Sequence, residues 1–302
     1  MNKTIAGDCP IHIEMHGDVS APCIVMILGL GMRLTEWPQN LLHRLSRDFH
    51  LICVENRDMG LSGRCGPDID TEATGMLAVG PDPKTVPYTL FDMRDDVLRV
   101  VDTLNIDRFA VVGFSMGGMI AQLIAAQAGS RVSGMVQMCS SAGEAHIPSS
   151  DNTWDRFMRT ARPFGTEAEL LNWLTEDLVW WSAPTPLSET GARAAARDMI
   201  AGGFSSGGYA RQLLALYGSG DRQAELKKIK VPALVIAGAQ DRCIVPDSSR
   251  HAHDLITGSN LVLCEGMGHA LDPRAIQHLE TWLRRVLSPQ PEITAKYAGG
   301  RT

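Results

Sequence analysis

Residues 109–118 read Phe-Ala-Val-Val-Gly-Phe-Ser-Met-Gly-Gly, and this stretch decides the fold. The apolar run Phe109–Phe114 predicts a buried strand, and the proline-free run Gly118–Ala128 predicts a helix. Between them lies a Gly-x-Ser-x-Gly pattern, which places Ser115 on a sharp strand-to-helix turn. Glycines flank such a serine because side chains there would collide with the neighbouring strand and helix. The pattern therefore predicts a nucleophile elbow, in which the serine hydroxyl is exposed for chemistry.

Apolar runs of the same kind recur along the chain, and each predicts a strand. They are Ile11–Met15, Cys23–Leu28, Leu51–Glu55, Gly134–Cys139, Ala233–Ala237 and Leu261–Cys264. From the second run onward they alternate with helical patterns such as Trp37–Ser46, Phe91–Leu104 and Ile276–Leu287. We therefore predict an α/β fold, with a mostly parallel central sheet of about eight strands flanked by helices. The first run, Ile11–Met15, is expected to be an antiparallel edge strand.

The alternation stops between residues 142 and 225, where three or four helical patterns follow one another. These patterns are Trp154–Arg162, Glu167–Trp181, Leu187–Met199 and Tyr209–Tyr217. We expect residues 142–225 to form a helical cap inserted between late strands of a core that comprises residues 1–141 and 226–288. Residues 289–302 are expected to be a disordered tail, because they hold prolines and glycines and few apolar residues.

Four of the six tryptophans fall in the predicted cap: Trp154, Trp173, Trp180 and Trp181. A helical insertion needs its own apolar core, which aromatic side chains supply. The underside of a cap can also line a substrate pocket. We expect both roles, and we take Trp154, Trp180 and Trp181 as candidate pocket residues.

Composition and charge exclude several classes of function. The chain has 302 residues, 44% hydrophobic and 21% charged, enough for a globular protein with a sizeable core. Its net charge is −6 with no run of lysines and arginines, which argues against binding to nucleic acid or to anionic membranes. No signal peptide or membrane span is evident, which predicts a cytoplasmic protein. The sequence leaves open whether the chain forms a homo-oligomer.

The seven cysteines are scattered, and no Cys-x-x-Cys pair occurs. Cys23, Cys53, Cys139 and Cys264 fall in or beside predicted strands, where a small buried thiol is ordinary. This spacing predicts neither a disulfide framework nor a zinc site, and it fits a reducing compartment. We expect no metal and no cofactor.

Serine is a poor nucleophile at neutral pH, so Ser115 needs a base, and the base needs an orienting acid. The partners are expected in the chain order serine, acid, histidine, in loops after late strands. Asp241 follows the predicted strand Ala233–Ala237, and His269 follows Leu261–Cys264. Because the carboxyl ends of parallel strands meet at one edge of a sheet, we predict a Ser115–His269–Asp241 triad.

Rival bases and acids are placed less well. They are His146, His251, His253, Asp247 and Glu265. The first histidine begins the predicted cap, and the other two lie on a predicted helix, where we expect them to be exposed. The two acids remain fallback candidates, because neither ends its strand as the predicted triad aspartate does.

Attack on a carbonyl also requires hydrogen-bond donors for the oxyanion that forms. One is expected from the backbone N–H of Met116, at the start of the elbow helix. The other is expected from residues 28–32 after an early strand, where flanking glycines let the Leu30 N–H turn inward. Glycines and adaptable methionines of these loops complete the candidate pocket: Gly29, Gly31, Met32 and Met267.

Over residues 11–287 the chain resembles the α/β-hydrolase superfamily. The resemblance rests on the elbow, on Asp241 followed by Ile-Val-Pro, and on Gly-Met-Gly-His at residues 266–269. It also rests on Glu55–Ser62, which is similar to the Asp-x-Arg-Gly-x-Gly-x-Ser segment of many members. In that segment we expect Arg57 to be structural, holding carbonyls and carboxylates beside the elbow.

Two departures from the common pattern point to one branch. Glu55 and Asp58 replace an aspartate and a glycine, and Leu28 replaces the histidine of the usual His-Gly pair. The Arg-Asp-x-Gly variant and the Gly-Met-Gly-His-Ala-Leu ending look most like the aclacinomycin methylesterase-like branch. That resemblance implies hydrolysis of carboxylic esters.

The residues and the resemblance together predict a cofactor-independent serine esterase, acting with water on an ester of a small apolar or aromatic substrate. The same triad would also serve a carbon–carbon bond hydrolase, an enol-lactonase, an acyltransferase or a perhydrolase. Haloalkane dehalogenases and epoxide hydrolases share the fold but resemble a pattern with an aspartate nucleophile, so Ser115 argues against both. From a different class, a ligand receptor that retains its triad is the alternative.

Overall fold

The computed structural model describes residues 1–66, 86–143, 152–185 and 187–287. Within them, eight strands form one sheet in the order β1-β2-β4-β3-β5-β6-β7-β8. The strands are β1 (Asn2–Ile5), β2 (Ile11–His16), β3 (Cys23–Ile27), β4 (His50–Val54), β5 (Phe109–Phe114), β6 (Val132–Met138), β7 (Ala233–Gly238) and β8 (Asn260–Cys264). The β1–β2 and β2–β4 pairs are antiparallel, and every pair from β4 to β8 is parallel. The predicted mostly parallel α/β architecture is confirmed.

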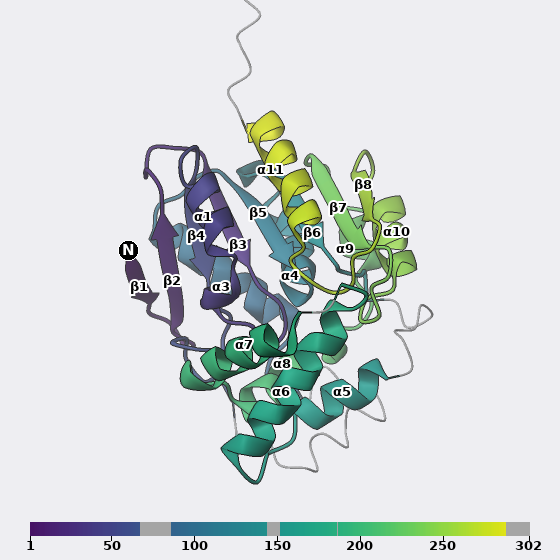
Figure 1. Ribbon diagram of the computed structural model, residues 1–302. Coiled ribbons are helices and arrows are strands. Elements are labelled where there is room, and N and C mark those ends of the chain that lie inside the picture. Colours follow the sequence, from purple (N-terminus) through teal and green to yellow (C-terminus); the bar gives the residue numbers. More distant parts are fainter. Residues whose placement is uncertain (67–85, 144–151, 186, 288–302) are drawn as a thin grey trace, which may run out of the picture.

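Helices cover both faces of this sheet (Figure 1). One face carries α1 (Gln39–Leu45) and α11 (Pro273–Leu287), and the other carries α3 (Leu90–Thr103), α4 (Met116–Ala128), α9 (Gln223–Leu226) and α10 (Pro246–Leu255). In β3, Val25 and Ile27 pack toward α3 and α4, whereas Ile24 and Met26 pack toward α1 and α11. Burial on both sides explains why the central strands read as continuous apolar runs. No helix in the described ranges is both long and apolar enough to cross a lipid bilayer.

Between β6 and β7, before α9, the described chain forms four helices that lie together below the sheet in Figure 1. They are α5 (Thr153–Thr160), α6 (Glu167–Ser182), α7 (Glu189–Ala201) and α8 (Ser206–Gly218). The side chains of Thr166, Ser188 and Ser205 cap the first turns of the last three helices by accepting backbone N–H groups. All four lie within residues 142–225, the expected cap, whose exact limits stay a prediction. The expected tail, residues 289–302, lies outside the described residues.

Three local expectations change in the structure. The strand at residues 11–15 is antiparallel as predicted, but it is not at the edge, because β1 pairs outside it. Three of the four residues of β1 are exposed, so its apolar signal is only Ile5. The helix predicted at Trp37–Ser46 is shorter in the structure, where α1 begins only after Pro38, and a separate 3₁₀ turn, η1 (Leu34–Glu36), precedes it. Pro38 has no N–H to continue a helix from that turn. The elbow helix begins at Met116 rather than Gly118, and it is followed by a second 3₁₀ turn, η2 (Gly129–Arg131).

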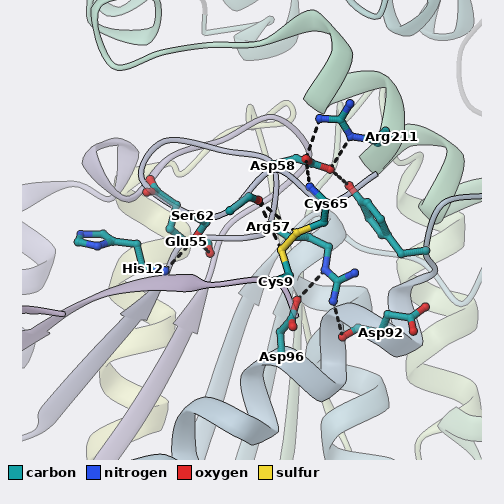
Figure 2. The surroundings of a disulfide bond; sticks show 12 residues. Cys9, His12, Glu55, Arg57, Asp58, Ser62, Cys65, Asp92, Asp96 and Arg211 are labelled. Carbon is teal, nitrogen blue, oxygen red and sulfur yellow. Dashed lines mark hydrogen bonds and ion pairs between the residues drawn. A yellow bond between two sulfur atoms is a disulfide. The ribbon is translucent and has the colours of Figure 1, made fainter. Parts of the chain in front are cut away.

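A disulfide joins Cys9 to Cys65 (Figure 2), which corrects the expectation drawn from the scattered cysteines. The two residues are 56 positions apart, so their pairing leaves no mark in the local sequence. The fold brings them together where the chain enters β2 beside the loop after β4, and Gly63 N–H donates to Pro10 O at 2.7 Å. The other five cysteines are free and buried, as expected for those in or beside strands.

Candidate active site

The turn between β5 and α4 places Ser115 at the carboxyl end of the central strand. Its φ of 54° and ψ of −122° are strained for a serine. The Ser115 N–H donates to Met138 O at 2.8 Å, and the Ser140 hydroxyl donates to Ser115 O at 3.0 Å. A side chain at Gly117 would collide with the carbonyl of Ile27. In the described part of the chain, the contacts that fix the elbow come from the sheet, the loop after β6 and α4, and not from the cap.

His269 and Asp241 meet Ser115 in one hydrogen-bonded relay. His269 Nε2 lies 3.0 Å from Ser115 Oγ, and His269 Nδ1 lies 2.8 Å from Asp241 Oδ2. The other carboxylate oxygen accepts the N–H groups of Cys243 and Ile244 at 2.8 and 2.9 Å. The Asp241 side chain is fully buried, and that of His269 is 10% exposed. When Nδ1–H donates to the carboxylate, Nε2 becomes an acceptor for the serine hydroxyl, as a general base requires.

The loop that carries the histidine is also held from the cap. His269 N–H donates to Trp181 O, at the end of α6, at 3.0 Å. The imidazole ring lies between Phe114 and Trp181, with centroids 5.0 and 6.1 Å away. These contacts leave the ring little freedom to turn away from Ser115.

The rival residues lie in other settings. The Asp247 side chain is 80% exposed, and Glu265 is also exposed, so neither is buried beside the histidine as Asp241 is. His251 and His253 are half-buried, which corrects the expectation that they are exposed. Their rings contact side chains on α9 and just after α10. His146 lies outside the described residues.

Two backbone N–H groups beside the serine are available to an oxyanion. A Cβ on Gly29 would lie only 3.0 Å from Ser115 Cβ, so the loop after β3 passes directly against the nucleophile. Among the described residues, no hydrogen-bond acceptor is found for the N–H of Leu30 or of Met116. Met116 opens α4, where backbone N–H groups lack intrahelical partners.

The neighbouring N–H groups of the same loop are already bonded. Gly31 N–H donates to Gln212 Oε1 at 2.8 Å, and Met32 N–H donates to Gly29 O at 3.3 Å. Gly31 and Met32 are therefore engaged, whereas the Leu30 N–H remains a candidate donor for a ligand.

A cavity of about 1700 Å³ lies under the cap and is lined by both Ser115 and His269. Cap helices and their connections supply most of its aromatic wall: Trp154, Phe157, Trp181, Phe204, Tyr209 and Tyr217. Of the candidate pocket residues, Gly31, Met32, Trp154 and Trp181 line the cavity. Phe157 was missed, although it lies one helical turn from Trp154, and a helical-face analysis would have found it.

Three candidate pocket residues are absent from the described lining. Gly29 lies behind the serine, against its Cβ. The Trp180 ring packs edge-on against Trp181 at 4.6 Å and under the Arg156 guanidinium at 4.6 Å. Met267 is 1% exposed and packs in the core beside α11. Sequence position placed these residues near the site, but Gly29 has no side chain and lies behind the serine, and the Trp180 and Met267 side chains pack elsewhere.

Charged side chains also reach the cavity wall. Arg33 N–H donates to Glu36 Oε1 at 2.8 Å, and Arg33 Nη2 donates to Asp198 O at 2.5 Å. Burial raises the pKa of Glu36 to about 7, against the opposing pull of Arg33. Near neutral pH this carboxyl is therefore present in both protonation states.

One group of metal-ligating residue types meets within the described chain: Cys139, Asp241 and His269, with ligand atoms within 4.8 Å of one another. Burial, and the nearby Asp241 carboxylate, raise the pKa of the Cys139 thiol well above its usual range. A thiol that keeps its proton is a poor metal ligand, and Asp241 and His269 are hydrogen-bonded to each other. The donor set suits proton transfer better than metal binding.

Comparison with known proteins finds relatives that the chain matches over most of their length. A family model described as alpha/beta hydrolase fold matches residues 22–271. The chain is similar to a rhodomycin D methylesterase of a Streptomyces species, 27% identical over 278 residues that cover 84% of this chain and 87% of the relative. It is also similar to 3-oxoadipate enol-lactonase 2 of Acinetobacter baylyi, 25% identical over 90% of this chain and 92% of the relative.

Solved structures show the same fold. An enol-lactonase from Burkholderia xenovorans superposes with a TM-score of 0.74 at 24% identity, covering 95% of this chain and 100% of that one. A thermophilic esterase from Thermogutta terrifontis superposes with a TM-score of 0.72 at 20% identity, with the same coverage of 95% and 100%.

Proposed function

Because the chain belongs to the alpha/beta hydrolase fold family, we propose that it is a serine hydrolase that cleaves carboxylic esters through an acyl-enzyme. The observation that carries the proposal is the relay Ser115–His269–Asp241, with its hydrogen bonds of 3.0 and 2.8 Å at the wall of a large cavity. A relay of this geometry supplies a nucleophile, a base and an orienting acid.

In the first half of the reaction, Ser115 Oγ attacks the ester carbonyl carbon while His269 Nε2 takes the hydroxyl proton. The carbonyl oxygen becomes an oxyanion, which accepts hydrogen bonds from the Leu30 and Met116 N–H groups. When the intermediate collapses, the bond to the alcohol oxygen breaks and His269 gives that oxygen its proton. The alcohol leaves, and the acyl group stays on Ser115.

In the second half, water replaces the alcohol. His269 takes a proton from the water as the water oxygen attacks the acyl carbon, and it then returns a proton to Ser115 Oγ. The carboxylic acid leaves and the enzyme is restored. Throughout, Asp241 holds the histidine in the tautomer whose Nε2 accepts a proton.

The cavity supports an ester with an apolar or aromatic group. Its aromatic wall suits such a group, and the similarity to a rhodomycin D methylesterase supports a methyl ester as the bond to be cut. A volume of about 1700 Å³ exceeds the roughly 300–1,000 Å³ of ordinary ligand pockets. We therefore propose a larger acid part than the small one that the sequence predicts.

A second candidate is the opening of a lactone. The relative named 3-oxoadipate enol-lactonase 2 covers 90% of this chain, which favours this candidate. A lactone is a cyclic ester, so the same steps apply, except that the leaving oxygen stays attached to the acyl group.

The test compares the wild-type protein with Ser115→Ala on p-nitrophenyl esters of graded acyl length, on methyl esters of aromatic acids and on an enol-lactone. We expect turnover by the wild type and a loss of at least about 10⁴-fold in the folded variant. A fluorophosphonate should add to Ser115, as detected by mass spectrometry. Tight binding of these esters without turnover or labelling would contradict the proposal and support a receptor. A kcat/KM for the enol-lactone far above that of every open-chain ester would favour the second candidate.

A further inference from the structure

We infer that Gln212, on cap helix α8, is a positioning residue for the oxyanion loop, residues 29–32. A helix of the cap would then determine how well a loop of the core stabilises the oxyanion. The inference rests on the proposed function, since only an acyl-transfer reaction makes this demand on the loop.

The Gln212 amide bridges two core segments. Its Oε1 accepts Gly31 N–H at 2.8 Å, and its Nε2 donates to Arg57 O at 2.7 Å. The side chain has no exposed surface, so water does not compete for either bond. Because one neighbour is a donor and the other an acceptor, only one orientation of the amide satisfies both.

This bridge acts on the residue next to the expected donor. The peptide bond is planar, so fixing Gly31 N–H also fixes the Leu30 carbonyl in the same plane. Gly31 adopts a φ of 71°, and a Cβ there would lie 2.5 Å from the ring of Tyr209, which is also on α8. Leu30 is thus held between the elbow on one side and α8 on the other.

The helix that carries Gln212 is itself anchored at the preceding residue. Arg211 forms a two-point ion pair with Asp58, with Nε–Oδ2 and Nη2–Oδ1 distances of 3.0 and 2.7 Å (Figure 2). Asp58 also accepts the Tyr88 hydroxyl at 2.5 Å and the Cys65 N–H at 2.9 Å. Both charged side chains are almost fully buried, at 2% and 0% exposure. Arg211 and Gln212 therefore join α8 to consecutive residues of one core segment.

Arg57, the other residue of that segment, is tied to α3. Arg57 Nε donates to Asp96 Oδ2 at 2.6 Å, and its Nη2 donates to Asp92 O at 3.4 Å, both on α3 (Figure 2). The Arg57 carbonyl that accepts the Gln212 hydrogen bond is consequently held in place. This also agrees with the structural role expected for Arg57.

Oxyanion donors stabilise the transition state only when they are aimed at the oxygen of the tetrahedral intermediate. Loss of the bridge would misdirect Leu30 N–H, and it would leave substrate binding in the aromatic cavity largely intact. A positioning role therefore predicts a fall in kcat with little change in KM, whereas a merely structural role predicts lower stability alone.

The central variant is Gln212→Met, which keeps the length of the side chain and removes both hydrogen bonds. On a p-nitrophenyl ester we expect kcat to fall roughly 10- to 100-fold, with KM changed by less than about 3-fold. Affinity for a boronic acid that mimics the tetrahedral intermediate should fall in parallel. Gln212→Glu keeps an oxygen opposite Gly31 N–H, so it should recover part of the lost kcat.

The matched control is Gln137→Met, which removes another fully buried amide. Gln137 Oε1 accepts from Gln122 Nε2 at 2.7 Å, and neither residue is part of the described cavity lining. The control should lower the melting temperature but change kcat by less than about 2-fold.

Three results would overturn the inference. The first is that Gln212→Met keeps the kcat and the boronic-acid affinity of the wild type. The second is that the Gln137→Met control loses as much kcat as Gln212→Met. Should Gln212→Met fail to fold, Gln212→Asn takes its place, because the shorter amide cannot span both partners. A wild-type kcat in Gln212→Asn would then contradict the inference. The third is unchanged hydrogen–deuterium exchange at the Gly31 amide in these variants, which we expect to become faster. If the wild type neither cleaves esters nor reacts with a fluorophosphonate, the proposed function fails separately, and the exchange data still decide whether Gln212 holds the loop.

Discussion

The nucleophile elbow and the oxyanion loop face the same substrate carbonyl in the proposed mechanism, yet they are held in opposite ways. Ser115 is held by residues of β5, β6 and α4, all of them near it in sequence or in adjacent strands. Gly31 is held by Gln212, 181 positions along the chain, and Arg33 contacts Asp198, 165 positions along. Among the described residues, the nucleophile is thus held by the core, whereas the oxyanion loop is held in part by the cap. Variants that act on one side and not the other test this division.

The largest effect is expected on the side of the core. Asp241→Asn removes the carboxylate that orients His269 and leaves an oxygen that can still accept the N–H groups of Cys243 and Ile244. We expect kcat to fall about 10⁴-fold, because the histidine is then held in the wrong tautomer. Steady-state kinetics on a p-nitrophenyl ester measure kcat, and circular dichroism checks that the variant is folded. Near-normal turnover would mean that another acid, such as Glu265, orients His269.

The next effect breaks the anchor between cap and core. Asp58→Asn removes the carboxylate that forms the two-point ion pair with the buried Arg211 guanidinium, and we expect the free energy of unfolding to fall by about 3–5 kcal/mol. Urea denaturation measures this change. The double variant Asp58→Asn with Arg211→Met also removes the buried positive charge and should regain part of the loss. A loss of unfolding free energy below about 1 kcal/mol in the single variant is what an exposed, weak ion pair would give. That result would show that the cap is not anchored by this pair.

A pair of glycine variants compares the two sides directly. In Gly117→Ala the new methyl group meets the carbonyls of Ile27 and Leu28, which the sheet prevents from moving, so we expect a loss of about 3 kcal/mol in unfolding free energy. In Gly31→Ala it meets the Tyr209 ring at a positive φ, and we expect about 1–2 kcal/mol. Thermal melts rank the two. The reverse ranking would mean that the cap side is the more rigid.

The smallest effect concerns pH and lies on the side of the oxyanion loop. Burial raises the pKa of Glu36 from its ordinary 4.5 to about 7, so between these values the folded chain holds a proton that the unfolded chain has released. Stability therefore falls as pH rises through this window, by about 1 kcal/mol for a half-buried group. Glu36→Gln should flatten that part of the curve of unfolding free energy against pH. A slope identical to that of the wild type would show that Glu36 does not cause it.

The same division explains what could be predicted from sequence. The elbow, Asp241 and His269 each end a strand that the apolar pattern reveals, so their meeting at one edge of the sheet follows from parallel topology. The α/β alternation and the helical insertion follow in the same way from continuous apolar runs and their interruption.

What sequence could not show depends on contacts between distant segments. Gln212 looks like any polar residue of a helix until the fold brings Gly31 and Arg57 to its two ends. Trp180 and Trp181 are neighbours on one helix, yet only the second faces the cavity, because successive helical side chains point about 100° apart. The edge strand β1 has too little apolar character to be recognised, since its stability comes from pairing with β2.

The Cys9–Cys65 bridge has a topological consequence for this arrangement. It closes the intervening chain into a covalent ring that contains β2, β3, α1, β4 and the oxyanion loop. A protease that cuts once inside this ring leaves the protein in a single covalent piece, and two fragments separate only after a reductant opens the bridge. After one break in the backbone of this ring, the chain on both sides of the oxyanion loop therefore stays covalently attached to the rest of the molecule.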